Sequence, residues 1–454
     1  MSPAHIPRYI NFSELDRWDV KYFSIKIKSK YPLIALATFV REHNEKVRPS
    51  NFPEETFKIL GVNNTDGIFH AYDALGKEIK QPYKKVSAGD FAYNPYRINV
   101  GSIGWVPDEH DGAFISPAYV VFSIDENIIL PELFWFILKS EFFNKTLRAA
   151  TAGSVRMNLT YPLLGTLKIP VPPIHVQQKI VAYWEKIQKA VLKSNEEVSQ
   201  ITNTIQDGFI SDLGLSGPKK TIPSKCFSTN WGKFDRWSVS YNQAVMSMID
   251  LRKGKYPVVG LGSILELVQY GTSEKANITQ NGTPVLRMNN IKDGALDYSD
   301  LKHVELSSKA RKSLLLKDGD ILFNRTNSKE LVGKCAVFHS EDEYVFASYL
   351  IRVKVNPTKA DPDFVVYTLN TVIGRQQIDA ISRQIIGQAN INSQELRSLN
   401  LPLPPLKVQQ NIMKNVESGR AKIQQIKEAS EKLQIEASSN IEKLILGNLS
   451  VENL

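Results

Sequence analysis

One proline-rich phrase occurs twice in this chain, and it limits the possible folds more than any other feature. It reads "IPVPPIHVQQKI" from Ile169 to Ile180 and "LPLPPLKVQQNI" from Leu401 to Ile412. The two copies lie roughly half a chain apart. An internal repeat decides the architecture, so this one must be tested before any other reading of the sequence.

Other pairs of similar segments occur in the same order in the two halves, which predicts a tandem duplication. The pairs are "DRWDVKYF" from Asp16 with "DRWSVSYN" from Asp235, "YPLIALA" from Tyr31 with "YPVVGLG" from Tyr256, and "GDFAYN" from Gly89 with "GDILFN" from Gly319. In each half, short strand-like runs broken by Gly, Asn and Pro turns precede short helical stretches and one long polar helix. This composition of elements predicts an α+β fold.

The proline phrase predicts the start of each long helix, because proline fits the first helical turn and disrupts later ones. The first helix is expected to begin near Pro173 and to run toward Ile210, a length of about 54 Å. Its apolar residues follow the alternating spacing of three and four that is typical of a coiled-coil seam. The two predicted seams are Ile180, Trp184, Ile187, Val191, Val198, Ile201 and Ile205, and then Ile412, Val416, Ile423, Ile426 and Leu433. We expect the two helices to pack on each other; the alternative is a coiled coil that dimerises the protein.

The net charge of +9 favours a polyanionic partner, because neutralised phosphates release condensed counterions. No apolar run approaches the roughly 18 residues that span a bilayer. The two cysteines, Cys226 and Cys335, lack metal or redox spacing. We therefore expect a cytoplasmic protein without a membrane partner.

Polar, glycine-containing loops at corresponding places in the two halves are the candidate DNA contacts. Arg and Asn can each pair with a base through two hydrogen bonds, while Ser, Thr and Tyr commonly bind phosphate. The candidates are Tyr93, Asn94, Tyr96, Arg97, Asn99 and Ser102 in the first half, and Tyr270, Thr272, Ser273, Arg287, Asn289, Asn290, Asn324, Arg325, Thr326 and Ser328 in the second. The alternative is that these loops are ordinary solvated turns.

The sequence predicts neither a catalytic site nor a metal site. "NPY" from Asn94 lacks the second proline of the box with which amino-methyltransferases hold the target amine, and no glycine-rich S-adenosylmethionine loop is found. The seven histidines lack metal-ligand spacing. The acidic residues Asp108, Glu109 and Asp111 are expected in a solvated loop rather than in a nuclease site.

With these motifs, the chain resembles a specificity subunit of a Type I restriction–modification enzyme over nearly its full length. The resemblance rests on the two proline–glutamine phrases, the two "GD" stretches, "YGTS" from Tyr270, and the repeated order of domain and then helix. It implies two target recognition domains, 1–170 and 233–402, and two spacer helices, 171–212 and 403–446, that pair as an antiparallel coiled coil. A linker, 213–232, and a tail, 447–454, complete the chain.

The resemblance also implies the function. Each domain would read one half of a split, asymmetric double-stranded DNA sequence, and the chain would itself be non-catalytic. Two methyltransferase subunits would bind to it, and two restriction subunits can join them. S-adenosylmethionine, ATP and Mg would be used by these partners and not by this chain. The role of the paired glutamines stays open.

Two other functions fit parts of the sequence. A stand-alone DNA-binding regulator with two reading heads would need no methyltransferase partner. A fused methyltransferase would itself bind S-adenosylmethionine, which the missing cofactor loop argues against.

Overall fold

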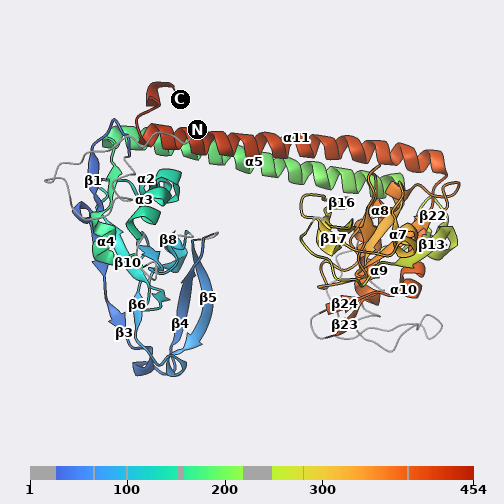
Figure 1. Ribbon diagram of the computed structural model, residues 1–454, viewed down its shortest axis with the longest axis horizontal. Coiled ribbons are helices and arrows are strands. Elements are labelled where there is room, and N and C mark those ends of the chain that lie inside the picture. Colours follow the sequence, from blue (N-terminus) through green and yellow to red (C-terminus); the bar gives the residue numbers. More distant parts are fainter. Residues whose placement is uncertain are drawn as a thin grey trace. The chain divides into compact units, whose positions relative to one another are not determined.

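The computed structural model describes residues 27–64, 67–98, 101–151, 158–217, 248–279, 281–385 and 388–453. The chain divides into two compact units. Unit 1 comprises Met1–Ser194 and Glu428–Leu454, and unit 2 comprises Asn195–Lys427. Each unit thus contains one α+β domain and a part of each long helix (Figure 1). The "DRW" phrases from Asp16 and Asp235 lie outside the described residues.

Unit 1 is built on two sheets and a strand pair. The four-stranded sheet has the order β2-β10-β7-β8 and the five-stranded sheet the order β3-β6-β9-β4-β5. Its strands are β1 (Leu33–Ala35), β2 (Val40–His43), β3 (Lys46–Val47), β4 (Thr56–Val62), β5 (Ile68–Leu75), β6 (Tyr83–Lys85), β7 (Phe91–Tyr93), β8 (Ile103–Trp105), β9 (Phe114–Ile115), β10 (Val120–Ile124) and β11 (Lys168–Pro170). The helices α2 (Pro131–Lys139), α3 (Glu141–Thr151) and α4 (Tyr161–Thr166) precede the long helix α5 (Ile174–Asp212).

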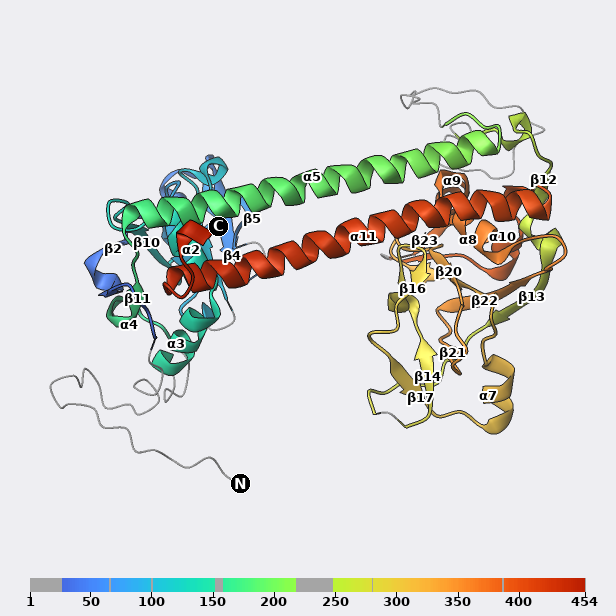
Figure 2. The same cartoon turned by 90° about the horizontal axis from the view of Figure 1, so that it is seen from above.

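Unit 2 has a four-stranded sheet of the order β13-β22-β18-β20 and several smaller sheets. The strands are β12 (Val258–Gly260), β13 (Leu265–Tyr270), β14 (Thr283–Leu286), β15 (Ile291–Lys292), β16 (Ala295–Leu296), β17 (Lys302–Val304), β18 (Ile321–Asn324), β19 (Thr326–Asn327), β20 (Cys335–Val337), β21 (Val345–Phe346), β22 (Leu350–Val355), β23 (Arg383–Ile385), β24 (Gln388–Asn390) and β25 (Asn400–Pro402). The helices are α7 (Ser308–Leu314), α8 (Pro362–Asn370), α9 (Val372–Ile381), α10 (Ser393–Arg397) and α11 (Leu406–Ile445). Figure 2 shows α7 beside the sheet of β17, β14 and β21.

The two four-stranded sheets connect their strands in the same way. In both sheets the second strand in chain order, β7 or β18, follows a "GD" turn, in which Gly89 (φ +87°) and Gly319 (φ +80°) adopt the left-handed conformation that favours glycine. In both turns the buried aspartate, Asp90 or Asp320, accepts a hydrogen bond from the backbone N–H three residues earlier. The "GD" stretches found in the sequence are therefore the same structural element in each unit.

The proline phrase forms a strand end, a corner and a helix start in each unit. Its first residues pair with the strand that opens the domain, β1 with β11 and β12 with β25. After the prolines, α5 begins at Ile174 and α11 at Leu406. The predicted helix start near Pro173 is confirmed, and the first helix ends at Asp212 rather than near Ile210.

The first glutamine of each phrase is completely buried and ties the long helix to its domain. Gln177 donates through Nε2 to the carbonyl oxygens of Ile128 (2.9 Å) and Pro172 (2.8 Å), and its Oε1 accepts from the N–H of Leu130 (2.8 Å). Leu130 is the residue that precedes the first turn of α2.

Gln409 repeats this arrangement in unit 2. It donates to the carbonyl oxygens of Lys359 (3.1 Å) and Pro404 (2.7 Å), and it accepts from the N–H of Asp361 (2.9 Å) at the start of α8. The second glutamines, Gln178 and Gln410, are exposed. The two glutamines of the phrase therefore have different roles, and the first of them is an internal structural group.

Within each unit, the predicted seam residues of α5 and α11 are the buried or half-buried residues of their helices. In unit 1, Ile187 and Val191 form a cluster with Ala437. In unit 2, Ile205 lies against Gly419, and Glu197 forms an ion pair with Lys422 (3.3 Å). The helix ends join the domain cores: Ile180 in unit 1, Ile412 and Val416 in unit 2. None of the helices in the described ranges combines the length and apolarity needed to cross a membrane.

The buried glutamine predicts a specific stability difference between neighbouring residues. Replacing Gln177 by Met leaves one N–H and two carbonyl groups without their partner, and we expect a loss of about 3 kcal/mol in the free energy of unfolding. The matched variant Gln178→Met changes an exposed side chain and should stay within about 0.5 kcal/mol of the wild type. Denaturant unfolding followed by circular dichroism measures both, and equal effects would contradict the role assigned to Gln177.

Gly208 and Gly419, which lie in the long helices α5 and α11, predict opposite responses to a larger side chain. A Cβ atom at Gly419 would lie 2.4 Å from Cδ1 and 2.7 Å from Cγ1 of Ile205, whereas a Cβ at Gly208 meets nothing within 4 Å. Gly419→Leu should destabilise the protein by about 2 kcal/mol through overpacking. Gly208→Leu should stabilise its exposed helix by about 0.5 kcal/mol through helix propensity. Parallel thermal unfolding of the two variants tests this, and a stabilising Gly419→Leu would contradict the packing described.

Candidate nucleic-acid interface

In unit 1, the loop after β7 carries the predicted residues that are accessible. Asn94 is half-buried, and its Oδ1 accepts a hydrogen bond from the N–H of Tyr96 (3.0 Å), which fixes the turn. Tyr96 (57% exposed) and Arg97 project from this turn. Asn99 lies outside the described residues. The accessible candidates of this loop are therefore Asn94, Tyr96 and Arg97.

In unit 1, the predictions that the side chains of Tyr93 and Ser102 contact DNA are wrong. Tyr93 is fully buried, its hydroxyl donates to the carbonyl of Leu159 (3.0 Å), and burial raises its pKa. Ser102 is also buried and donates to the carbonyl of Val62 (3.0 Å). Both polar groups already have partners inside the domain, so neither can contact DNA in this conformation.

In unit 2, three predicted loops converge on the segment that precedes β22. Thr272 forms a parallel bridge with Ala347, and its N–H donates to the carbonyl of Phe346 (2.9 Å). The N–H of Arg325 donates to the carbonyl of Tyr349 (3.0 Å). Leu286, directly before Arg287, pairs with Phe346. The structure thus brings together residues that are widely separated in the sequence.

The "YGTS" motif explains part of this arrangement. A Cβ atom at Gly271 would lie 2.3 Å from the carbonyl oxygen of Ala347, so only glycine permits this close approach. Thr272 accepts a hydrogen bond from the N–H of Glu274 (3.1 Å) through Oγ1, and Ser273 is exposed. Tyr270 is 42% exposed beside the guanidinium of Arg325.

The remaining candidates of unit 2 divide into structural and accessible groups. Asn324 is 1% exposed and donates to the carbonyl of Leu331 (3.2 Å). Asn290 is 2% exposed and donates to the carbonyls of Asp297 (2.8 Å) and Asp300 (2.9 Å). As DNA-contacting side chains, Asn290 and Asn324 are wrong predictions, because their amides hold turns inside the domain.

The other four are at least partly accessible. Asn289 is exposed, whereas Thr326 and Ser328 are half-buried. The hydroxyl of Thr326 donates a hydrogen bond to Oδ1 of Asn390 (3.4 Å). A backbone hydrogen bond lowers the pKa of Glu330, and a hydrogen bond with the side chain of Ser328 lowers it further. Arg287 is 18% exposed and forms an ion pair with Asp300 (2.9 Å).

Buried charges support the strands that lead to these loops. Asp320 lies 3.5 Å from Arg352, and burial raises the pKa of Asp320 while it lowers the pKa of Arg352. Arg352 also donates to the carbonyls of Leu315 (2.7 Å) and Ser313 (3.0 Å), and it pairs with Gln269. Sequence reasoning missed Arg352, since its partners lie far away in the sequence. In the sequence, the two matching "GD" stretches were the signal that pointed to its partner Asp320.

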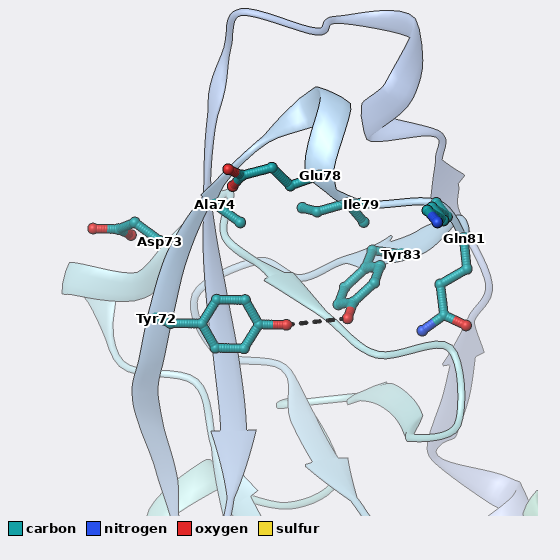
Figure 3. A pocket seen from close by; sticks show the side chains of 8 residues that line it. Tyr72, Asp73, Ala74, Glu78, Ile79, Gln81 and Tyr83 are labelled. Carbon is teal, nitrogen blue, oxygen red and sulfur yellow. Dashed lines mark hydrogen bonds between the residues drawn. The ribbon is translucent and has the colours of Figure 1, made fainter.

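A cavity of about 520 Å³ in unit 1 is lined by Tyr72, Asp73, Ala74, Glu78, Ile79, Lys80, Gln81 and Tyr83. In Figure 3 the hydroxyls of Tyr72 and Tyr83 point toward each other, at 3.4 Å. Its carboxylates have local partners: Asp73 pairs with His70 (2.9 Å), and Glu78 accepts from the N–H of Leu75 (3.0 Å). Within the described ranges, no group of His, Cys, Asp or Glu is arranged to hold a metal ion.

Comparison with known proteins shows which proteins this chain is similar to. Residues 253–437 match the family model described as "Type I restriction modification DNA specificity domain". Over these residues the chain matches that family, and its resemblance to Type I specificity subunits is confirmed.

Among its relatives is the putative type I restriction enzyme MjaX specificity subunit of Methanocaldococcus jannaschii, 32% identical over 34% of this chain and 37% of that protein. Another is the EcoKI specificity subunit of Escherichia coli K12, 24% identical over 64% of this chain and 59% of that protein. The chain thus aligns with between about a third and three-fifths of the length of these two relatives. A chain from a solved structure of a type I R-M system shares the fold, with a TM-score of 0.58 and 16% identity over 93% of this chain and 100% of that chain.

Proposed function

We propose that this chain is the DNA-specificity subunit of a Type I restriction–modification complex and reads a split, asymmetric target with one half-site per domain. The observation that carries the proposal is the repeated scaffold. The matched specificity domain in the second half has a counterpart in unit 1 with the same sheet order, the same "GD" turn and the same buried glutamine.

Sequence differences between the units support two different half-sites. The loop that follows β7 in unit 1 presents Tyr96 and Arg97, whereas unit 2 presents Tyr270 and Arg325. Different side chains at the ends of similar strands would read different bases, so the target would not be a palindrome.

The long helices would form the spacer between the half-sites as an antiparallel coiled coil. In support, Tyr183 near the start of α5 lies 3.5 Å from Asn440 near the end of α11. The end of α5 shares a cluster with the start of α11, in which Phe209 packs with Ile412 and Met413. The seam spacing of three and four residues fits such a pairing.

The chemistry of the complex would belong to partner subunits. Two methyltransferase subunits would bind S-adenosylmethionine and methylate adenine, and restriction subunits would use ATP and Mg to cleave DNA. This chain would supply sequence recognition and a scaffold in the cytoplasm.

Mapping methylated adenines tests the proposal directly. Cells that carry this chain with its methyltransferase partner should methylate adenines in one split motif, with two specified parts and an unspecified gap of fixed length. The control strain carries the methyltransferase alone and should lack this methylation. Unsplit methylation, or none in both strains, would refute the proposal.

The accessible guanidinium of Arg325 predicts a base-specific effect in one half-site. Arg325→Ala should relax recognition at one position of the second half-site and cost about 1–3 kcal/mol of discrimination there, because a bidentate contact with a guanine would be lost. Methylation mapping and competition binding measure the change, and the first half-site serves as internal control. A uniform loss of affinity on all sequences would instead assign Arg325 to phosphate binding.

A further inference from the structure

The side chain of Arg325 differs from those of two other arginines of unit 2, because each of those two is paired with a carboxylate. Arg287 is paired with Asp300, and Arg352 is paired with Asp320. Among the described residues, no acceptor forms a hydrogen bond or ion pair with the Arg325 side chain, although its Nε is buried. An arginine held in place without an acceptor can offer its N–H groups to a ligand.

The aromatic ring of Tyr270 holds this guanidinium. The Cζ atom of Arg325 lies 5.0 Å from the centroid of the ring, within the range of a cation–π contact. The ring is itself fixed, because its hydroxyl accepts a hydrogen bond from the N–H of Ser393 (3.1 Å). The close approach of Gly271 to Ala347 fixes the backbone next to Tyr270.

The backbone of Arg325 is fixed on both sides. Its N–H donates to the carbonyl of Tyr349 (3.0 Å), and its carbonyl accepts from the N–H of Ile391 (2.9 Å). The main chain and the face of the guanidinium are therefore both positioned, and the outer N–H groups remain for recognition. Such preorganisation reduces the entropy lost on binding.

The pair is specific to unit 2. The strand pairing shows which positions of the two four-stranded sheets are equivalent. In unit 2, Arg352 of the central strand pairs with Leu322 on one side and with Gln269 on the other. In unit 1, Val121 pairs in the same way with Ala92 and with His43. Continuing by this register, the positions of Tyr270 and Arg325 are occupied in unit 1 by Asn44 and Pro95, which cannot form a cation–π pair.

We infer that Tyr270 is a positioning residue: it holds the Arg325 guanidinium in place to hydrogen-bond the edge of one guanine in the second half-site. Tyr270 acts through Arg325 and sets specificity at that base pair. This inference rests on the proposed function and adds a recognition unit at positions where unit 1 has Asn44 and Pro95.

A double-mutant cycle on the full chain with its methyltransferase partner tests the inference. The probes are the duplex target found by methylation mapping and a series of duplexes with one base pair replaced. Tyr270→Leu should reduce discrimination at the Arg325 position by about three- to thirtyfold, the range expected for a lost cation–π contact. Combined with Arg325→Ala, it should cause no further loss. Tyr270→Phe, which keeps the ring, should retain most of the discrimination.

Tyr349→Leu is the matched control, since Tyr349 is 50% exposed on the same surface and contacts Arg325 through its backbone. The loss of discrimination caused by Tyr349→Leu should multiply with the loss caused by Arg325→Ala. Thermal unfolding checks that every variant is folded. If Tyr270→Leu does not fold, the test is made with Tyr270→Phe.

Independent, multiplying losses for Tyr270→Leu and Arg325→Ala would overturn the inference, as would an equal loss on all duplexes. Loss of discrimination in Tyr270→Phe as large as in Arg325→Ala would also overturn it. A wild-type complex without sequence preference would instead refute the proposed function. The two failures are therefore distinguishable.

Discussion

In each unit a buried amide side chain connects the domain to the start of its long helix, and the fold of the unit depends on this connection. Gln177 and Gln409 each use the donor and the acceptor of the amide to bind three backbone groups. One partner belongs to the proline corner, and the other two belong to the segment that leads into helix α2 in unit 1 or helix α8 in unit 2. Because buried polar groups must be paired, the amide fixes the direction in which the long helix leaves its domain.

The candidate contacts of the two units lie at or just beyond the ends of equivalent strands. The four-stranded sheets share their order, and their buried carboxylates Asp90 and Asp320 hold equivalent turns. Accessible side chains at or just beyond the strand ends differ between the units: Tyr96 and Arg97 in unit 1, and Tyr270 and Arg325 in unit 2. Substitutions at these positions change the exposed surface and leave the core hydrogen bonds intact.

Local and periodic features of the structure could be predicted from the sequence. The proline corner, the "GD" turns and the seam spacing depend on residues that are close together along the chain. The candidate contacts were harder to predict, because residue type does not reveal burial. Asn324 resembles a base-reading residue in sequence, yet its amide serves a turn. Tyr270 and Arg325 were both predicted, but their stacking joins segments far apart in the chain and needed the structure.

The division of the chain into units has a consequence for how it folds during synthesis. Unit 2 is one continuous segment, Asn195–Lys427, whereas unit 1 also requires Glu428–Leu454. Ile441, Leu444 and Ile445 of the late segment belong to the main core of unit 1. Domains usually fold as they emerge from the ribosome. Here the unit whose synthesis begins first is completed last, so its core cannot close until residues 428–454 have been made.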